Sequence, residues 1–186
     1  MKILCFGDSN TFGYDPRGWF GGRYDNPWPQ LLADKTGWNV LNRGENGREI
    51  PLYGWNTSEE LDFLVIMLGT NDLLQGNSPQ TVAKRMEVFL DSIDLEKMQI
   101  LLIAPPALKR GEWVDSDFLI EASKELSVFY RELSRRLGVR FANAAQWDVP
   151  LAFDGVHFTE DGHRAFAEEL YQYLIKEGIQ LCFRTR

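Results

Sequence analysis

Several runs of apolar residues in this 186-residue chain are too short for core helices and are stopped at once by turn-forming residues. Residues 3–6 are followed directly by Gly7, and residues 61–68 by the sequence Gly-Thr-Asn-Asp. Such runs are typical of strands buried on both faces, and those strands belong to parallel sheets. The same reasoning predicts further strands at residues 38–41, 99–104 and 139–142.

Helical patterns separate these strands. The clearest is residues 79–92, which begins with a proline and carries apolar side chains at helical spacing. The full set of predicted helices is 29–35, 79–92, 117–137 and 160–176. Strands that alternate with helices predict an α/β fold, a three-layer α/β/α sandwich built on a mainly parallel, five-stranded sheet. We expect one domain over residues 1–186, with the flavodoxin-like strand order 2-1-3-4-5.

Composition excludes several classes of partner. The net charge is −7 with a pI near 4.9, which disfavours binding to nucleic acid or to an anionic membrane. The apolar run at residues 3–6 is too short for a signal peptide, and no run approaches a membrane span. Cys5 and Cys182 lie at opposite ends of the chain, without the spacing of metal ligands or of a disulfide framework. We therefore expect a reduced, cytoplasmic protein without a cofactor or metal.

Chemically suggestive residues follow the predicted strands. Ser9 follows the first strand, Gly44 the second and Asn71 the third, while Asp154 and His157 lie beyond the fifth. In the predicted strand order the first strand lies between the second and the third, so Gly44 and Asn71 should flank Ser9. Ligands of open α/β sheets bind in the crevice at this edge.

Acyl transfer accounts for this set of residues. A serine hydroxyl becomes a good nucleophile when a histidine takes its proton, and the histidine needs a carboxylate to fix its tautomer. One tight turn can bring Asp154 to Nδ1 of His157 and leave Nε2 for Ser9. A tetrahedral intermediate also needs hydrogen-bond donors, which a backbone N–H at Gly44 and the amide of Asn71 can supply.

These residues resemble those of the SGNH, or GDSL-type, esterases and acyl hydrolases. The resemblance rests on Phe6-Gly7-Asp8-Ser9-Asn10, on Gly44, on Gly69-Thr70-Asn71-Asp72 and on Asp154-Gly155-Val156-His157-Phe158, which span nearly the whole chain. It implies Ser9 as nucleophile, His157 as base and Asp154 as its orienting carboxylate. It also implies an oxyanion hole formed by the N–H groups of Ser9 and Gly44 with the Asn71 side chain. The sequences around Asn71 and His157 are similar to those of the arylesterase/acyltransferase branch, whereas Asn10 stands where the family name has leucine.

Structural roles compete with these functional ones. Asn71 and Gly44 are also turn-forming residue types, and Ser9 could be an ordinary residue of a strand-to-helix turn. We expect Asp8 and Asp72 to hold their loops by hydrogen bonds from backbone N–H groups. The second histidine, His163, has no serine partner, and we expect it to be solvated or hydrogen-bonded locally.

The loops of the predicted active edge carry two arginines and many aromatic residues. Arg43 and Arg48 could meet an anionic substrate, but a loop-bracing or solvated role is the stronger expectation. Some aromatic side chains should form a substrate pocket and others should cover the core, and the sequence does not divide them: Trp19, Phe20, Trp28, Trp113 and Trp147.

The leading functional hypothesis is a serine hydrolase that cleaves carboxylic esters with short acyl groups, such as acetyl or aryl esters, through an acyl-enzyme on Ser9. One alternative is a metal-dependent phosphoesterase that uses Asp8, Asn71, Asp72, Asp154 and His157 as ligands. Another is a non-catalytic, flavodoxin-like binding module. The expected partner is a small ester, and the aromatic loops allow self-association into a homo-oligomer.

Overall fold

The computed structural model describes residues 1–18, 21–53, 55, 57 and 59–179 of the chain. The predicted loop aromatics Trp19 and Phe20 and the thiol of Cys182 lie outside these residues. The strands are β1 (Lys2–Gly7), β2 (Tyr14–Asp15), β3 (Gly22–Arg23), β4 (Asn39–Gly44), β5 (Phe63–Met67), β6 (Ile100–Ala104) and β7 (Arg140–Asn143). The α-helices are α1 (Ser9–Phe12), α2 (Trp28–Thr36), α3 (Thr70–Leu74), α4 (Pro79–Asp91), α5 (Asp117–Leu137) and α6 (Glu160–Lys176). Short 3₁₀ helices span Lys97–Gln99 and Ala144–Gln146.

The central sheet has five strands in the order β4-β1-β5-β6-β7, and every neighbouring pair is parallel. Numbered along the chain within this sheet, the order is 2-1-3-4-5, so the predicted flavodoxin-like α/β architecture is confirmed. Because β1 lies between β4 and β5, the segments that follow these three strands meet at one edge.

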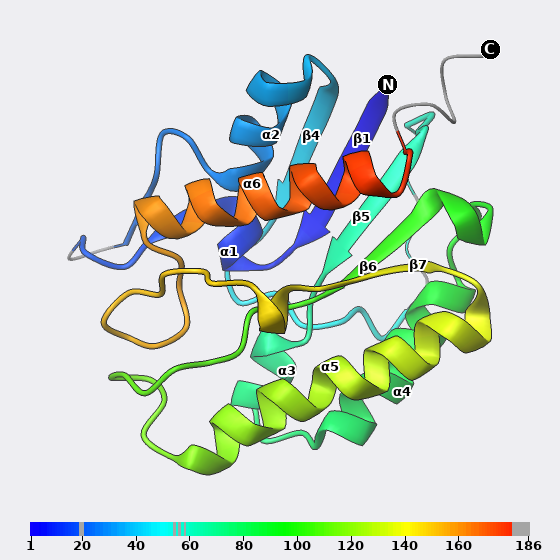
Figure 1. Ribbon diagram of the computed structural model, residues 1–186. Helices are drawn as coiled ribbons and strands as arrows, with labels where there is room; N and C mark the ends of the chain where they lie inside the picture. The colour runs from blue at the N-terminus through cyan, green and yellow to red at the C-terminus, as the bar shows by residue number, and fades with distance from the viewer. Residues whose placement is uncertain (19–20, 54, 56, 58, 180–186) are drawn as a thin grey trace.

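Two helical layers cover the sheet. Figure 1 shows α2 and α6 on one face and α4 and α5 on the other. Alternate residues of β1 divide between the faces: Ile3 packs with the α2–α6 layer, whereas Leu4 packs with the α4–α5 layer. This alternation follows from the two-residue period of a strand, and it explains why the strands read as continuous apolar runs.

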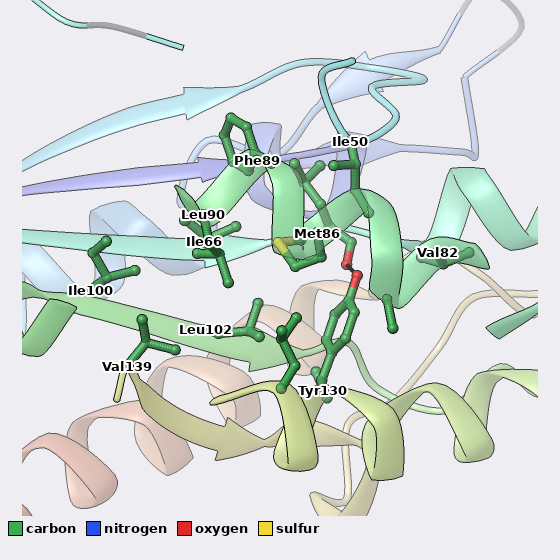
Figure 2. Close-up of a cluster of buried hydrophobic side chains, with 14 of the residues drawn as sticks. Ile50, Ile66, Val82, Met86, Phe89, Leu90, Ile100, Leu102, Tyr130 and Val139 are labelled. Atoms are coloured by element: carbon green, nitrogen blue, oxygen red, sulfur yellow. Dashed lines mark hydrogen bonds between the residues drawn. The ribbon is translucent and has the colours of Figure 1, made fainter. Parts of the chain in front are cut away.

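The core on the α4–α5 face is closely filled. Figure 2 shows Met86 of α4 and Tyr130 of α5 gathered against Ile66 and Leu102 of the sheet. The hydroxyl of Tyr130 donates to the carbonyl oxygen of Leu68 at 3.1 Å, so its one polar atom is paired although the side chain is fully buried. This contact fixes the end of β5 directly before α3, the helix that carries Asn71.

Helix boundaries follow local signals where these are strong. Ser116 caps α5 by accepting the N–H of Leu119, and Gly138 ends it in the left-handed conformation at φ 73°. Both ends of α5 and of α6 agree with the prediction.

Several boundaries differ from the prediction by one to three residues; β5, for example, begins at Phe63 instead of residue 61. The second sheet strand continues to Gly44 instead of ending at residue 41, because Gly44 remains in register with Gly7 of β1. Helix α2 begins at Trp28, with Pro27 as its N-cap residue and without a side-chain cap. The sequence analysis also missed the short helices α1 and α3 and the hairpin of β2 and β3. In the described part of the chain, no helix is both long enough and apolar enough to span a membrane.

Candidate active site

Ser9 is the first residue of α1, immediately beyond the end of β1. Asp8 caps this helix, because its Oδ1 accepts the N–H of Asn10 at 3.0 Å. Glycine is required at position 7, since a Cβ there would lie 2.0 Å from Oγ1 of Thr11. The tight turn therefore holds the Ser9 side chain at the carboxyl edge of the sheet.

Asp154 and His157 are joined through a single turn. Oδ1 of Asp154 accepts the backbone N–H groups of Val156 and His157, each at 2.9 Å. Oδ2 lies 2.6 Å from Nδ1 of His157. Burial by itself would raise the pKa of Asp154, but these hydrogen bonds outweigh it and lower the pKa below its ordinary value. The carboxylate is therefore charged and oriented toward the imidazole.

The other ring nitrogen of His157 meets Ser9. Its Nε2 lies 3.0 Å from Oγ of Ser9, and both residues are buried. A carboxylate on Nδ1 favours the tautomer in which Nε2 is an acceptor, so the imidazole can take the hydroxyl proton. The structure thus brings together the three residues that the sequence analysis singled out from positions far apart in the chain.

Asn10 holds this arrangement in register, a role that the sequence analysis missed. Its Nδ2 donates to the carbonyl oxygen of Val156 at 3.1 Å, and its Oδ1 accepts the N–H of Phe158 at 2.8 Å. The residue after Ser9 thereby binds the backbone on both sides of His157. The departure from leucine at this position was the available signal, because only a polar side chain can make both bonds.

Asn71 lies in the first turn of α3, which follows β5, the strand paired with β1. Its Nδ2 donates to the carbonyl oxygen of Arg48 at 2.9 Å. An amide nitrogen carries two hydrogens, so this bond orients the group and leaves the second hydrogen for a ligand. The N–H of Ser9 donates to no acceptor among the described residues.

The prediction that Gly44 offers its N–H to an oxyanion is not supported by the geometry. That N–H donates to Oδ1 of Asn42 at 2.9 Å, so it is already occupied. Gly44 serves close packing instead, since a Cβ there would lie 2.0 Å from the backbone nitrogen of Phe12. The sequence analysis therefore misjudged whether the backbone N–H of Gly44 is free.

Gly47, three residues later, carries a backbone N–H that is not occupied in this way. It adopts the left-handed conformation at φ 73°, and its N–H donates to no acceptor in the described ranges. Both neighbouring parts of its loop are tied to the site: the N–H of Glu45 donates to Gly7 at 3.1 Å, and the carbonyl of Arg48 holds Asn71. Glycine in the Asn-Gly pair was the signal for this turn.

The expected loop-bracing roles are confirmed on this side of the site. Oδ2 of Asp72 accepts the N–H of Ile50 at 3.1 Å, and its Oδ1 accepts Nη1 of Arg85 at 3.0 Å. Burial raises the pKa of Asp72 despite these partners. The guanidinium of Arg48 donates to the carbonyl of Gly7 at 2.9 Å and lies over the ring of Phe6. Arg48 is therefore committed to the loop rather than to a substrate anion.

The loop aromatics divide clearly. Trp28 and Trp147 pack against Phe166 of α6 and belong to the core on that face. Trp113 contacts His157 and is 53% exposed. Among the described tryptophans of the predicted set, only Trp113 borders the Ser9–His157 pair.

The prediction for His163 is wrong. This residue is fully buried rather than solvated, and its Nδ1 accepts the N–H of Trp28, which is distant in sequence, at 3.3 Å. Its Nε2 has no hydrogen-bond partner among the described residues. Burial lowers its pKa to about 3, so the ring is neutral and contributes to packing. The packing of α6 against α2 decides this environment.

The described residues do not assemble a metal site. No three His, Cys, Asp or Glu side chains among them are grouped so that they could hold an ion. Of the ligands that the phosphoesterase alternative requires, Asp72 is bound by Arg85, and Asp154 is bound by His157 and by backbone N–H groups.

Comparisons with known proteins agree with this geometry. The profile of the GDSL-like lipase/acylhydrolase family matches residues 5–165. A carbohydrate acetylesterase family member from Sinorhizobium meliloti has a similar structure, with a TM-score of 0.76 at 26% identity over 94% of this chain and 97% of the other. The aryl esterase of M. smegmatis gives a TM-score of 0.72 at 25% identity over 92% and 98% of the two chains. A sequence comparison with curated proteins finds no match.

Proposed function

The chain belongs to the GDSL-like lipase/acylhydrolase family and is a carboxylic ester hydrolase, and from this premise we propose that it acts through an acyl-enzyme on Ser9. The observation that carries the proposal is the hydrogen-bonded series from Ser9 Oγ through His157 to Asp154, with distances of 3.0 and 2.6 Å. The two bonds connect a nucleophile to its base and that base to an orienting carboxylate.

In the proposed acylation step, Oγ of Ser9 forms a bond to the ester carbonyl carbon while its proton passes to Nε2 of His157. The carbon–oxygen bond to the alcohol then breaks, and the same proton moves from Nε2 to the departing oxygen. Water repeats the sequence on the acyl-enzyme and releases the acid. Asp154 stays charged throughout and stabilises the imidazolium, in keeping with its lowered pKa.

Three donors are proposed for the oxyanion of the tetrahedral intermediate. They are the N–H of Ser9, the second hydrogen of the Asn71 amide and the N–H of Gly47, which replaces the predicted Gly44. Support comes from the lack of an acceptor for each of them among the described residues, since a donor can stabilise a developing charge only when it is not already bonded.

Short acyl groups, such as acetyl, are the proposed acyl portion of the substrate. One structurally similar protein is named as a carbohydrate acetylesterase and another as an aryl esterase. The described core uses most apolar side chains between sheet and helices, which leaves few for a long acyl channel. In a series of p-nitrophenyl esters from acetate to decanoate, we expect kcat/KM to be highest for the short esters. A steady rise toward decanoate would contradict this.

Replacement of the nucleophile tests the proposal directly. Ser9→Ala should lower kcat for p-nitrophenyl acetate by more than about 10³-fold, because the residual rate then rests on binding and oxyanion stabilisation alone. A fluorophosphonate should add its mass to wild-type protein and not to the variant. Retention of more than about a hundredth of the wild-type turnover would show that Ser9 is not the nucleophile.

The remaining expectations are proposals of the same kind. We propose a small ester as the partner and a cytoplasmic location; the location is supported by the presence of only two cysteines in the sequence, of which the described one, Cys5, is a buried free thiol. A homo-oligomer stays a proposal that light scattering can test.

A further inference from the structure

The direction of proton transfer defines one side of the site. If Ser9 and His157 act as proposed, Nε2 of His157 delivers its proton to the departing alcohol oxygen. The alcohol portion of the ester must therefore lie beside the imidazole, whereas the carbonyl oxygen faces Asn71. Side chains next to His157 accordingly contact the alcohol and not the acyl group.

Two aromatic rings flank His157. Tyr14 of the β2–β3 hairpin lies with its ring centroid 4.6 Å from that of His157 at 52°, and Trp113 lies at 5.0 Å and 81°. The Tyr14 ring is held by the hairpin, because a Cβ on Gly21 would lie 2.4 Å from its Cε2. The alcohol side of the site is therefore bordered by aromatic surface.

Trp113 is held in place although it is exposed. Gly111 and Val114 exchange backbone hydrogen bonds, so Trp113 lies within a tight hairpin turn. Its N–H donates to the carbonyl of Asp154 at 3.1 Å, and the side chain of Val114 is completely buried. Gly111 allows this approach, since a Cβ there would lie 2.4 Å from the carbonyl carbon of Asp154. The fold thus fixes a half-exposed indole beside the reacting imidazole.

We propose that Trp113, together with Tyr14, forms the binding subsite for the alcohol portion of the ester and selects alcohols that carry an aromatic ring. An exposed indole contributes little to the core, and its surface is suited to a flat aromatic partner. This inference rests on the proposed function and adds the specificity of its alcohol side.

Acyl transfer to competing alcohols tests the proposal. The enzyme receives p-nitrophenyl acetate together with equal concentrations of benzyl alcohol and n-butanol, and the ratio of benzyl acetate to butyl acetate is measured. The two alcohols are of similar acidity, so the ratio reports recognition. Any loss of His157 positioning slows both transfers equally and leaves the ratio unchanged.

Wild-type enzyme should favour benzyl acetate, and Trp113→Ala should lower the product ratio roughly 3- to 10-fold, the range expected for one aromatic pair. Trp113→Phe should retain most of the preference. Phe118→Ala is the matched control, because Phe118 is also exposed, at 75%, and no ring contact joins it to His157; its ratio should equal that of the wild type.

The outcomes separate this inference from the proposed function. Mass spectrometry of quenched reactions reports whether acetyl-Ser9 forms. Acetyl-Ser9 with an unchanged product ratio in Trp113→Ala overturns the alcohol subsite alone. Absence of acetyl-Ser9 in the wild type overturns the acyl-enzyme proposal and the subsite together. A lower ratio with acetyl-Ser9 present supports both.

Discussion

On one side of Ser9, the hydrogen-bonding atoms of Asp154 and the ring nitrogens of His157 are all paired, with Ser9 itself as the last partner. On the other side, the N–H groups of Ser9 and Gly47 have no acceptor among the described residues, and the Asn71 amide has one committed hydrogen. The proposed mechanism accounts for this difference, because in it the two sides serve charges that exist at different times. A carboxylate is charged in the resting protein and needs its donors there. An oxyanion appears only near the transition state, so its donors must be held by other groups and kept free.

The largest expected effect comes from a change to Asp154, on the side of Ser9 where the hydrogen-bonding atoms are paired. Asp154→Asn should lower kcat on the order of 10⁴-fold. The amide would donate to Nδ1 of His157, which forces the proton onto Nε2 and prevents that nitrogen from accepting the Ser9 proton. The carbonyl oxygen can still accept the N–H groups of Val156 and His157, so the denaturation midpoint should change little. A variant with near wild-type kcat would mean that another group orients His157.

Asn71→Ala tests the other side, where the donors have no acceptor. We expect kcat to fall roughly 10²–10³-fold with little change in KM. Asn77→Ala is a matched control, because Nδ2 of Asn77 likewise donates to a backbone carbonyl, that of Asp72, at 2.9 Å. Its kcat should match the wild type. A change confined to KM in Asn71→Ala would indicate ground-state binding and contradict the proposed oxyanion role.

Another buried aspartate, Asp8, extends the comparison to the pH dependence of stability. Asp8 is as deeply buried as Asp154, but burial outweighs its few hydrogen bonds and raises its pKa to about 6. The folded state therefore keeps a proton that the unfolded state releases above its ordinary value of 3.8. Wild-type stability should consequently fall as the pH rises from 4 to 6 through this group, and the loss should be complete above about pH 6.

Asp8→Asn removes this titration and keeps a residue that caps helices well. Its free energy of unfolding, relative to the wild type, should increase across pH 4–6 and then level off. On this plateau the variant should be more stable than the wild type by only about 1 kcal/mol, because the buried amide also needs hydrogen-bond partners. Urea unfolding at pH 4, 5, 6 and 7 measures the difference. A difference that is constant with pH would show that Asp8 ionises normally.

Local sequence determined much of this protein. Apolar runs ended by turn-forming residues predicted the sheet strands, and Gly7 with Asp8 predicted the turn that presents Ser9. The Asp154–His157 pair was readable because a carboxylate three residues before a histidine can reach it within one turn. These features depend on neighbours in the chain, so no knowledge of packing was needed to find them.

Tertiary structure decided what depends on distant segments. The N–H of Gly44 is occupied because Oδ1 of Asn42 accepts it, and Asn42 is itself oriented by the distant α1, where the carbonyl of Thr11 accepts its Nδ2 at 2.8 Å. The burial of His163 depends on α2, and the contact of Trp113 with His157 joins two loops from different strands. A sequence specifies residue types and local spacing, whereas access to a hydrogen or a ring is set by whichever segment packs against it. That is why Ser9, Asp154 and His157 could be singled out from the chain alone, whereas the free N–H of Gly47 and the contact of Trp113 with His157 could not.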